Sequence, residues 1–253
     1  AALSVNGVDR DLAITPDGSR IVYIASNGTQ LLMRALDALD PVTIFKGPVR
    51  EPAISPDGQW VAFADGTTVK RIAITGGPAV NVTASDAAPR GVAWTSNDTI
   101  VFATTGPAGL QSVTGVGSMP VALTQPDRAQ GEIDHYWPEA LPDGRGVLFT
   151  ITAAGGLDTA QVAVLDPRTS AYKILIRGGS HAHYVHSGHL VYASSGTLRA
   201  VAFDLENLEI RGTPVPVLSD VVTTGIGSVD AVVAENGTLA YVSGNAAGPQ
   251  RTL

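Results

Sequence analysis

Three arginines recur at one interval in the first part of the chain. Arg10, Arg50 and Arg90 are each 40 residues apart. If the chain repeats with this period, their guanidinium groups occupy equivalent places on one arc, and such groups suit carboxylate or phosphate ligands. Asp11 and Glu51 directly follow two of them, so each arginine could instead pair with an acid of a neighbouring unit. The pattern therefore predicts either an anion-binding arc or a set of structural ion pairs.

Four of the five histidines lie in two short stretches further along the chain. His135 stands in an acidic and aromatic stretch that also holds Asp134, and the other three lie in residues 181–186. His181 and His183 would share one face of a strand, because strand side chains alternate between faces. Together with Asp134 they are weak candidates for a divalent-metal site. The alternative is that these histidines are hydrogen-bonded core residues.

The predicted ligand-binding residues are those that would gather at the mouth of a common channel, on the face where the inner strands begin. They are Arg10, Arg50, Arg90, His135, Tyr136, Trp137, His181 and His183. Trp137 offers a stacking surface for a sugar or an aromatic ligand, although a tryptophan before a proline also suits a packing role. No catalytic residue is predicted, because the chain lacks cysteine and a Gly-x-Ser-x-Gly elbow. No cofactor is predicted apart from the divalent metal.

The elements that must position these residues follow a repeat. A turn such as Thr-Pro-Asp-Gly, followed by a strand rich in valine and isoleucine, occurs six times. The turns are anchored at Gly18, Gly58, Asp98, Gly144, Gly188 and Gly237, with separations of 40, 40, 46, 44 and 49 residues. Proline presets φ, Asp or Asn bonds its own backbone, and glycine supplies a positive φ. A period of about 40–50 residues is typical of a four-stranded propeller blade.

The repeat predicts an all-β fold, a six-bladed β-propeller of four-stranded antiparallel blades that forms a single domain over residues 1–253. A β-sandwich is the alternative fold. The sixth unit is short, since few residues follow Tyr241. An open ring would leave a sheet edge exposed. We therefore expect residues 2–5 to pair into the sixth blade as an N-terminal strand that closes the ring.

Composition narrows the classes of function. The net charge is −7, with 16 basic and 23 acidic residues, which argues against general nucleic-acid binding. The absence of cysteine excludes disulfides and thiolate metal sites. No apolar run reaches the roughly 20 residues that span a bilayer, and no signal peptide is visible, so no membrane span is expected within the chain.

Several motifs resemble a known family. The Pro-Asp-Gly turns resemble the TolB-like, PD40-type (WD40-like) propeller repeat. Four stretches are more specific: residues 131–138 (GEIDHYWP), 187–193 (SGHLVYA), 213–218 (TPVPVL) and 237–242 (GTLAYV). They resemble the C-terminal sensor propeller of bacterial transmembrane serine/threonine protein kinases. The resemblance implies an extracytoplasmic domain that binds a ligand and signals inward. Any kinase activity would lie outside this chain, which has no kinase signature.

Three functions are open at this point. The first is a non-catalytic sensor that binds a small anionic ligand, a peptide or a protein at the channel face. The second is a metal-dependent hydrolase or lactonase that uses the channel, and paired carboxylates for glycoside hydrolysis also stay open. The third is a TolB-like scaffold that docks a protein partner.

Overall fold

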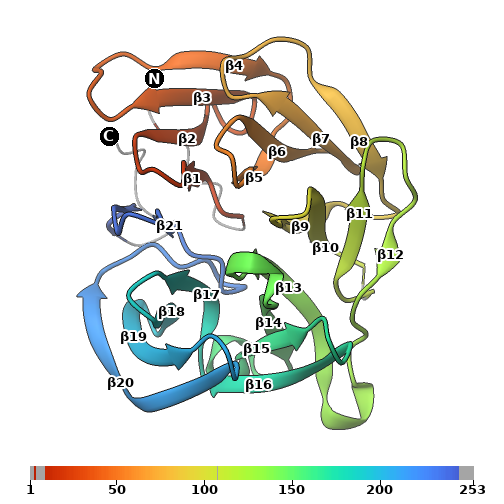
Figure 1. Cartoon of the computed structure of the whole chain (residues 1–253), viewed down its shortest axis with the longest axis vertical. Coiled ribbons are helices and arrows are strands. Elements are labelled where there is room, and N and C mark those ends of the chain that lie inside the picture. The colour runs from red at the N-terminus through yellow and green to blue at the C-terminus, as the bar shows by residue number, and fades with distance from the viewer. Residues whose placement is uncertain (1–2, 4–8, 107, 245–253) are drawn as a thin grey trace.

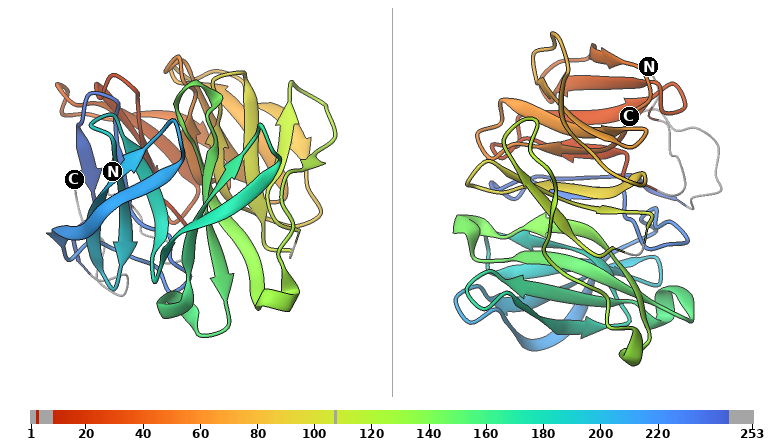
Figure 2. Two further views of the ribbon diagram at one scale, coloured as in Figure 1. Left: turned by 60° about the horizontal axis from the view of Figure 1, so that its bottom comes forward. Right: turned by 90° about the vertical axis from the view of Figure 1, so that its right-hand side faces the viewer.

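The chain folds into antiparallel sheets arranged around a central axis, as the computed structural model in Figure 1 shows. The structure describes residue 3, residues 9–106 and residues 108–244. Each blade is a meander whose strands pair in chain order. Figure 2 shows the sheets stacked face to face, with their strands running roughly along the axis.

Five blades have four strands each. The first contains β1 (Leu12–Ile14), β2 (Arg20–Ala25), β3 (Gln30–Ala35) and β4 (Val42–Lys46). The second contains β5 (Arg50–Ile54), β6 (Trp60–Asp65), β7 (Thr68–Ala73) and β8 (Val80–Ala84). The third contains β9 (Pro89–Trp94), β10 (Thr99–Thr104), β11 (Gln111–Thr114) and β12 (Val121–Ala122).

The fourth blade contains β13 (Glu132–Ala140), β14 (Val147–Ala153), β15 (Gln161–Asp166) and β16 (Ala171–Arg177). The fifth contains β17 (Ser180–Val185), β18 (His189–Ser194), β19 (Thr197–Asp204) and β20 (Glu209–Ser219). Three short 3₁₀ helices accompany the fourth blade: η1 (Arg128–Gln130), η2 (Pro142–Gly144) and η3 (Gly156–Thr159). No helix among the described residues is long and apolar enough to cross a lipid bilayer.

The prediction of six four-stranded blades is wrong, because the structure has five. The sixth unit forms a two-stranded sheet of β21 (Ala231–Val233) and β22 (Leu239–Tyr241). The segment before it makes only isolated bridges, Val221 with Ser243 and Thr223 with Val229. No strand follows β22 in the described part of the chain, so the described residues give this unit two strands rather than four.

The predicted closure of the ring by an N-terminal strand is also wrong at Leu3, the one residue of that expected strand that the structure describes. Leu3 bridges Ala25 at the end of β2, in the first blade rather than in the sixth unit. The other residues of the expected strand, 2, 4 and 5, lie outside the described residues. The seam between the sixth unit and the first blade is instead closed by packing. A buried apolar cluster spans it, with Leu12, Tyr23 and Leu32 on one side and Val232 and Val242 on the other.

The turns that anchor the repeat have the conformation that the sequence predicts. All six anchor residues, including Asp98, have positive φ. In the first turn the Gly18 N–H donates to the Thr15 carbonyl at 2.8 Å, and the Asp17 carboxylate accepts from the Ser19 N–H at 2.9 Å. These local bonds reverse the chain between the inner strand and the second strand of a blade.

Apolar residues fill every space between neighbouring sheets. Alternate side chains of one strand enter different clusters: Ile21 and Tyr23 face the sixth unit, whereas Val22 and Ile24 face the second blade. The same alternation explains why second strands such as residues 60–65 (WVAFAD) are almost continuously apolar, since both faces of each sheet are buried. The inner strands β1, β5, β9, β13, β17 and β21 contact one another in this order, and β21 contacts β1.

Because packing closes the seam, truncation of a buried seam side chain should destabilise the folded protein. We expect Leu12→Ala to lower the free energy of unfolding by about 2–5 kcal/mol, because it leaves a cavity in the seam cluster. Leu39→Ala, at a side chain that is 92% exposed, should change it by less than about 0.5 kcal/mol. Urea unfolding followed by circular dichroism measures both, and equal effects would contradict closure by packing.

Candidate functional site

Each inner strand of blades two to five carries a backbone kink at one equivalent position. The residue seven places before the anchor has positive φ in all four blades: Glu51 at 52°, Gly91 at 88°, Trp137 at 48° and His181 at 46°. The pairing register breaks beside each of them. A β-bulge re-aims a side chain within a strand. The left-handed backbone costs about 1–3 kcal/mol at each non-glycine residue, so a repeated bulge must be held by the contacts around it.

Glycine is required at one of these bulges. A Cβ atom on Gly91 would lie 2.6 Å from the Cα of Trp137 in the next blade. Any other residue would force the third and fourth blades apart.

Polar residues seven to nine places before the anchors form a buried layer on the axis. Asp9, Arg10, Glu51, His181 and Asp230 belong to it, and each is at least nine-tenths buried. We call this set the axial polar layer.

Its hydrogen bonds link the blades. Arg10 reaches across the axis, and its Nη2 donates to the carbonyls of Pro52 at 2.9 Å and Val92 at 3.2 Å, in the second and third blades. The Asp11 N–H donates to Asp230 Oδ1 at 2.8 Å, and the Val229 N–H donates to His181 Nδ1 at 2.8 Å. The layer therefore connects the sixth unit to both of its neighbours.

Burial shifts the ionisation of this layer. It raises the pKa of Glu51 to about 8, with the charge of Asp9 acting in the same direction and Arg10 and Arg90 opposing it. Neither carboxylate oxygen of Glu51 accepts a hydrogen bond of ordinary geometry from the described residues. Burial also raises the pKa of Asp230 to about 7. Burial, and then the neighbouring His183 and Arg10, hold the pKa of His181 well below its usual range.

A cavity of about 440 Å³ lies on the axis between the axial polar layer and the anchor turns. Its wall consists of rings of equivalent residues, one from each repeat. The residues two places before the anchors form the rim: Pro16, Pro56, Ser96, Pro142, His186 and Glu235. Those four places before form the middle: Ile14, Ile54, Trp94, Ala140, Tyr184 and Val233. Those five places before form the lower ring: Ala13, Ala53, Ala93, Glu139, His183 and Val232.

The lower ring explains why there is a cavity. The first three blades place alanine there, and a methyl group fills little of the space near the axis. The fourth and fifth blades place Glu139 and His183 at the same level, so the polar side of the cavity faces three alanines. The cavity therefore arises from small residues that repeat with the blade period.

Glu139 and His183 form a hydrogen bond between the fourth and fifth blades. Glu139 Oε2 contacts His183 Nδ1, and Glu139 Oε1 accepts from the Tyr184 N–H at 2.9 Å. The carboxylate thus requires a proton on Nδ1 of the imidazole. His183 is 4% exposed, and its Nε2 has no partner among the described residues. In the neutral ring that nitrogen is a hydrogen-bond acceptor.

The three arginines occupy equivalent positions but do not converge on this cavity. Only Arg10 lines it. Arg50 is half exposed and pairs with Asp9 at 3.4 Å. The Arg90 guanidinium lies over the ring of Tyr136, 5.8 Å from its centroid. Each arginine therefore has a partner inside the fold.

Most of the remaining predicted residues contact other side chains or backbone groups of the fold and do not line the cavity. Trp137 and His181 stack in the core with ring centroids 5.8 Å apart. His183 is the other predicted residue that lines the cavity. Asp134 accepts from the Gly109 N–H at 3.3 Å and the His135 N–H at 2.8 Å. Among the described residues no group of three or more histidines and acids could hold a metal ion.

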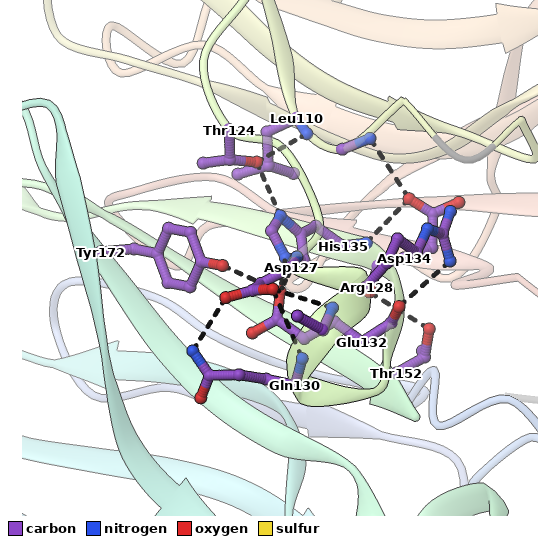
Figure 3. A network of polar contacts seen from close by, with 12 residues as sticks. Leu110, Thr124, Asp127, Arg128, Gln130, Glu132, Asp134, His135, Thr152 and Tyr172 are labelled. Atoms are coloured by element: carbon purple, nitrogen blue, oxygen red, sulfur yellow. Dashed lines mark hydrogen bonds and ion pairs between the residues drawn. The ribbon is translucent and has the colours of Figure 1, made fainter. Parts of the chain in front are cut away.

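His135 lies between the third and fourth blades, in the network that Figure 3 shows. Its Nδ1 bonds Thr124 Oγ1 at 2.7 Å and its Nε2 bonds Glu132 Oε2 at 3.0 Å. The same oxygen of Glu132 accepts from the Asp127 N–H at 2.7 Å and the Tyr172 hydroxyl at 2.8 Å. Burial lowers the pKa of His135. This network joins η1 to the fourth blade.

Reasoning from the sequence missed most of the cavity. Apart from His183, the ligand-binding residues that it selected lie seven to nine places before the anchors, whereas most of the cavity wall lies at the fifth, fourth and second places. Alignment of the repeats at the fifth place shows three alanines, then Glu139 and His183. That contrast between small and charged residues was the available signal.

The raised pKa values predict a pH dependence of stability. Glu51 keeps its proton in the folded state up to about pH 8, whereas the unfolded chain loses it near pH 4.5. The contribution of Glu51 to stability is therefore greatest at low pH and falls as pH rises from about 4.5 to about 8. In Glu51→Gln the fall in unfolding free energy between pH 5 and pH 9 should be smaller than in the wild type by at least about 1 kcal/mol.

Urea unfolding at both pH values measures this difference, with exposed Glu206→Gln as the matched control. A Glu51→Gln variant that loses as much stability as the wild type would show that Glu51 is ionised in the folded protein at neutral pH.

The fold resembles several solved propellers. No protein-family model and no curated protein matches the sequence. A putative TolB from Agrobacterium tumefaciens superposes with a TM-score of 0.67 and 16% identity, over 92% of this chain and 90% of that one. TolB from Acinetobacter baumannii superposes with a TM-score of 0.62 and 17% identity over 87% of this chain, which spans only 55% of that TolB chain.

An oligogalacturonate lyase from Vibrio parahaemolyticus superposes with a TM-score of 0.62 and 12% identity, over 92% of this chain and 73% of that one. At these identities the likeness shows the fold and not the activity. The chain has a β-propeller fold that is similar to the fold of the solved TolB structures.

Proposed function

We propose that this propeller is a non-catalytic binding module that takes a segment of a partner protein into its axial cavity. The observation that carries the proposal is the cavity itself, which is walled by equivalent residues from all six repeats. A segment bound on the axis would contact every blade at once. The volume of the cavity, about 440 Å³, lies within the usual range of about 300–1,000 Å³ for ligand sites.

The chemistry of the wall supports a protein segment as the ligand. The middle ring is largely apolar, with Trp94 and Tyr184 as aromatic surfaces. Trp and Tyr are enriched among the interface residues that contribute most of the binding energy between proteins. Pro16, Pro56 and Pro142 stiffen the rim, and a preorganised site loses less conformational entropy on binding.

The finer role that we propose is an extracytoplasmic sensor. Its support is the sequence resemblance of residues 131–138, 187–193, 213–218 and 237–242 to the sensor propellers of bacterial receptor-type serine/threonine kinases. The likeness to TolB propellers supports a protein-docking role of the same kind. In such a receptor, a partner bound in the cavity would be the signal.

Filling the cavity tests the proposed function without assuming the charge of the partner. Ala93→Phe, and independently Ala13→Phe, would place an aromatic ring where the lower ring now has a methyl group. A displayed library of random twelve-residue peptides is selected on the wild-type protein. We expect the enriched peptides to bind either filled variant at least about tenfold more weakly.

The matched control is Ala38→Phe, the same change at an exposed turn residue. A cooperative urea transition confirms that each variant is folded. Peptides that bind the filled variants as tightly as the wild type, or a library that yields no binders, would contradict binding in the cavity.

A further inference from the structure

The charged groups that line the cavity are mainly acidic. Glu139, Asp143 and Glu235 line it, and Arg10 is its one arginine or lysine among the described residues. A groove of about 430 Å³ shares Pro16, Pro56 and Glu235 with the cavity and adds the carboxylates of Asp17 and Asp57, together with one cation, Arg20. Four of the repeats therefore contribute an acid to the same face.

Two carboxylates of the groove, those of Asp17 and Asp57, are held in their charged form. Hydrogen bonds from the Thr15 hydroxyl and from the backbone and hydroxyl of Ser19 lower the pKa of Asp17 to about 2. The Ser55 hydroxyl and the Gln59 N–H lower the pKa of Asp57 in the same way. These groups carry negative charge at any physiological pH.

The guanidinium group of Arg10 has its hydrogen-bond partners within the fold. Its Nη2 is shared between two backbone carbonyls, and its charge lowers the pKa of both Glu51 and Asp230 beneath the cavity. Arg10 is thus held by backbone carbonyls at the bottom of the cavity, and none of the ion pairs between described residues joins it to Glu139, Asp143 or Glu235. A cleft in which acidic groups outnumber basic ones, as the lining of the cavity and groove shows, concentrates cationic ligands.

A second observation, independent of the acids, points to a ligand. His183 is more than nine-tenths buried and lines the cavity, but its Nε2 has no partner among the described residues. Buried polar atoms are nearly always hydrogen-bonded, to protein, water or ligand. Since Nδ1 is directed to Glu139, the neutral ring would offer its Nε2 lone pair to a donor.

We propose that the cavity recognises a lysine or arginine side chain in an exposed basic segment of the partner protein. The cationic group would donate to Glu139 and to His183 Nε2, and its aliphatic stem would pack against Trp94 and Tyr184. Both aromatic rings also favour a cation over their faces. Asp57, Asp143 and Glu235 would attract neighbouring basic residues of the same segment. The inference depends on the proposed function, because it assumes that the cavity is the binding site.

Defined peptides test the proposal. The probe is an acetylated and amidated heptapeptide with lysine, arginine and lysine at its centre, and its affinity is measured by isothermal titration calorimetry. We expect Glu139→Gln to weaken binding at least about tenfold, because it removes a charge-assisted hydrogen bond but keeps the shape of the side chain. The combined change Asp57→Asn, Asp143→Asn and Glu235→Gln should weaken binding by a similar factor.

Asp86→Asn is the matched control. It removes one exposed carboxylate before β9, at the opposite end of that inner strand from the cavity, and should leave the affinity within about twofold. A heptapeptide with glutamine at its three central positions should bind at least about tenfold more weakly than the basic one. Spermidine, a free polycation, separates a general attraction for cations from recognition of a peptide.

The outcomes distinguish the two proposals. Peptides that lose affinity for Ala93→Phe but bind Glu139→Gln and the triple variant as tightly as the wild type would overturn the basic partner and keep the cavity as the site. Equal affinity for the glutamine and basic heptapeptides would overturn it as well, as would tighter binding of spermidine than of the basic heptapeptide. A basic peptide that binds Ala93→Phe as tightly as the wild type would overturn the proposed function itself.

Discussion

Burial of both faces of every sheet is the constraint on which the rest of the molecule depends. A four-stranded sheet with an apolar face on each side must be covered twice, and a closed ring of sheets covers each one with its neighbours. The six apolar clusters show this directly, since each lies between two successive units. The two-stranded sixth unit is sufficient because it presents Val232 and Val242 to the first blade and Val229 and Ala231 to the fifth.

The inner strands are subject to a different constraint near the axis of the ring. Six strands converge there, and their side chains must fit a narrow space that water scarcely reaches. The bulges at Glu51, Trp137 and His181 bring large or polar side chains into this layer at a cost in backbone strain. Burial keeps Glu51 and Asp230 protonated to about neutral pH or above, and Arg10 donates to the backbone carbonyls of Pro52 and Val92. The axial polar layer therefore lies buried beneath the cavity.

The cavity follows from the same geometry. A position that repeats six times around an axis becomes a ring, so a change from an apolar to a polar residue in two neighbouring repeats makes a one-sided polar wall. Glu139 and His183 are that wall, and the acids of the anchor turns extend it outward. This arrangement supports a partner that inserts a basic side chain, whereas the arginines that recur in the sequence are held by Asp9, by backbone carbonyls and by Tyr136.

The sequence by itself determined the blade period, the anchor turns and the all-β class. These depend on local chemistry: proline, Asp or Asn, and glycine at a turn, followed by an apolar strand. It also determined which residues share a level around the axis, because equal offsets from the anchors become equal heights.

Only the tertiary structure decided the number of complete blades, the closure of the seam and the level at which the cavity lies. Leu3 pairs with the first blade and not, as the sequence had predicted, with the sixth unit. The sequence could not predict this pairing, because closure depends on how distant surfaces pack, which no local pattern encodes. The repeat placed Arg10, Arg50 and Arg90 on one ring, but the bulges and the neighbours of each arginine determine whether its side chain reaches a cavity, a carboxylate or an aromatic ring. Those neighbours come from other blades, so the directions of these side chains emerge only when the ring is assembled.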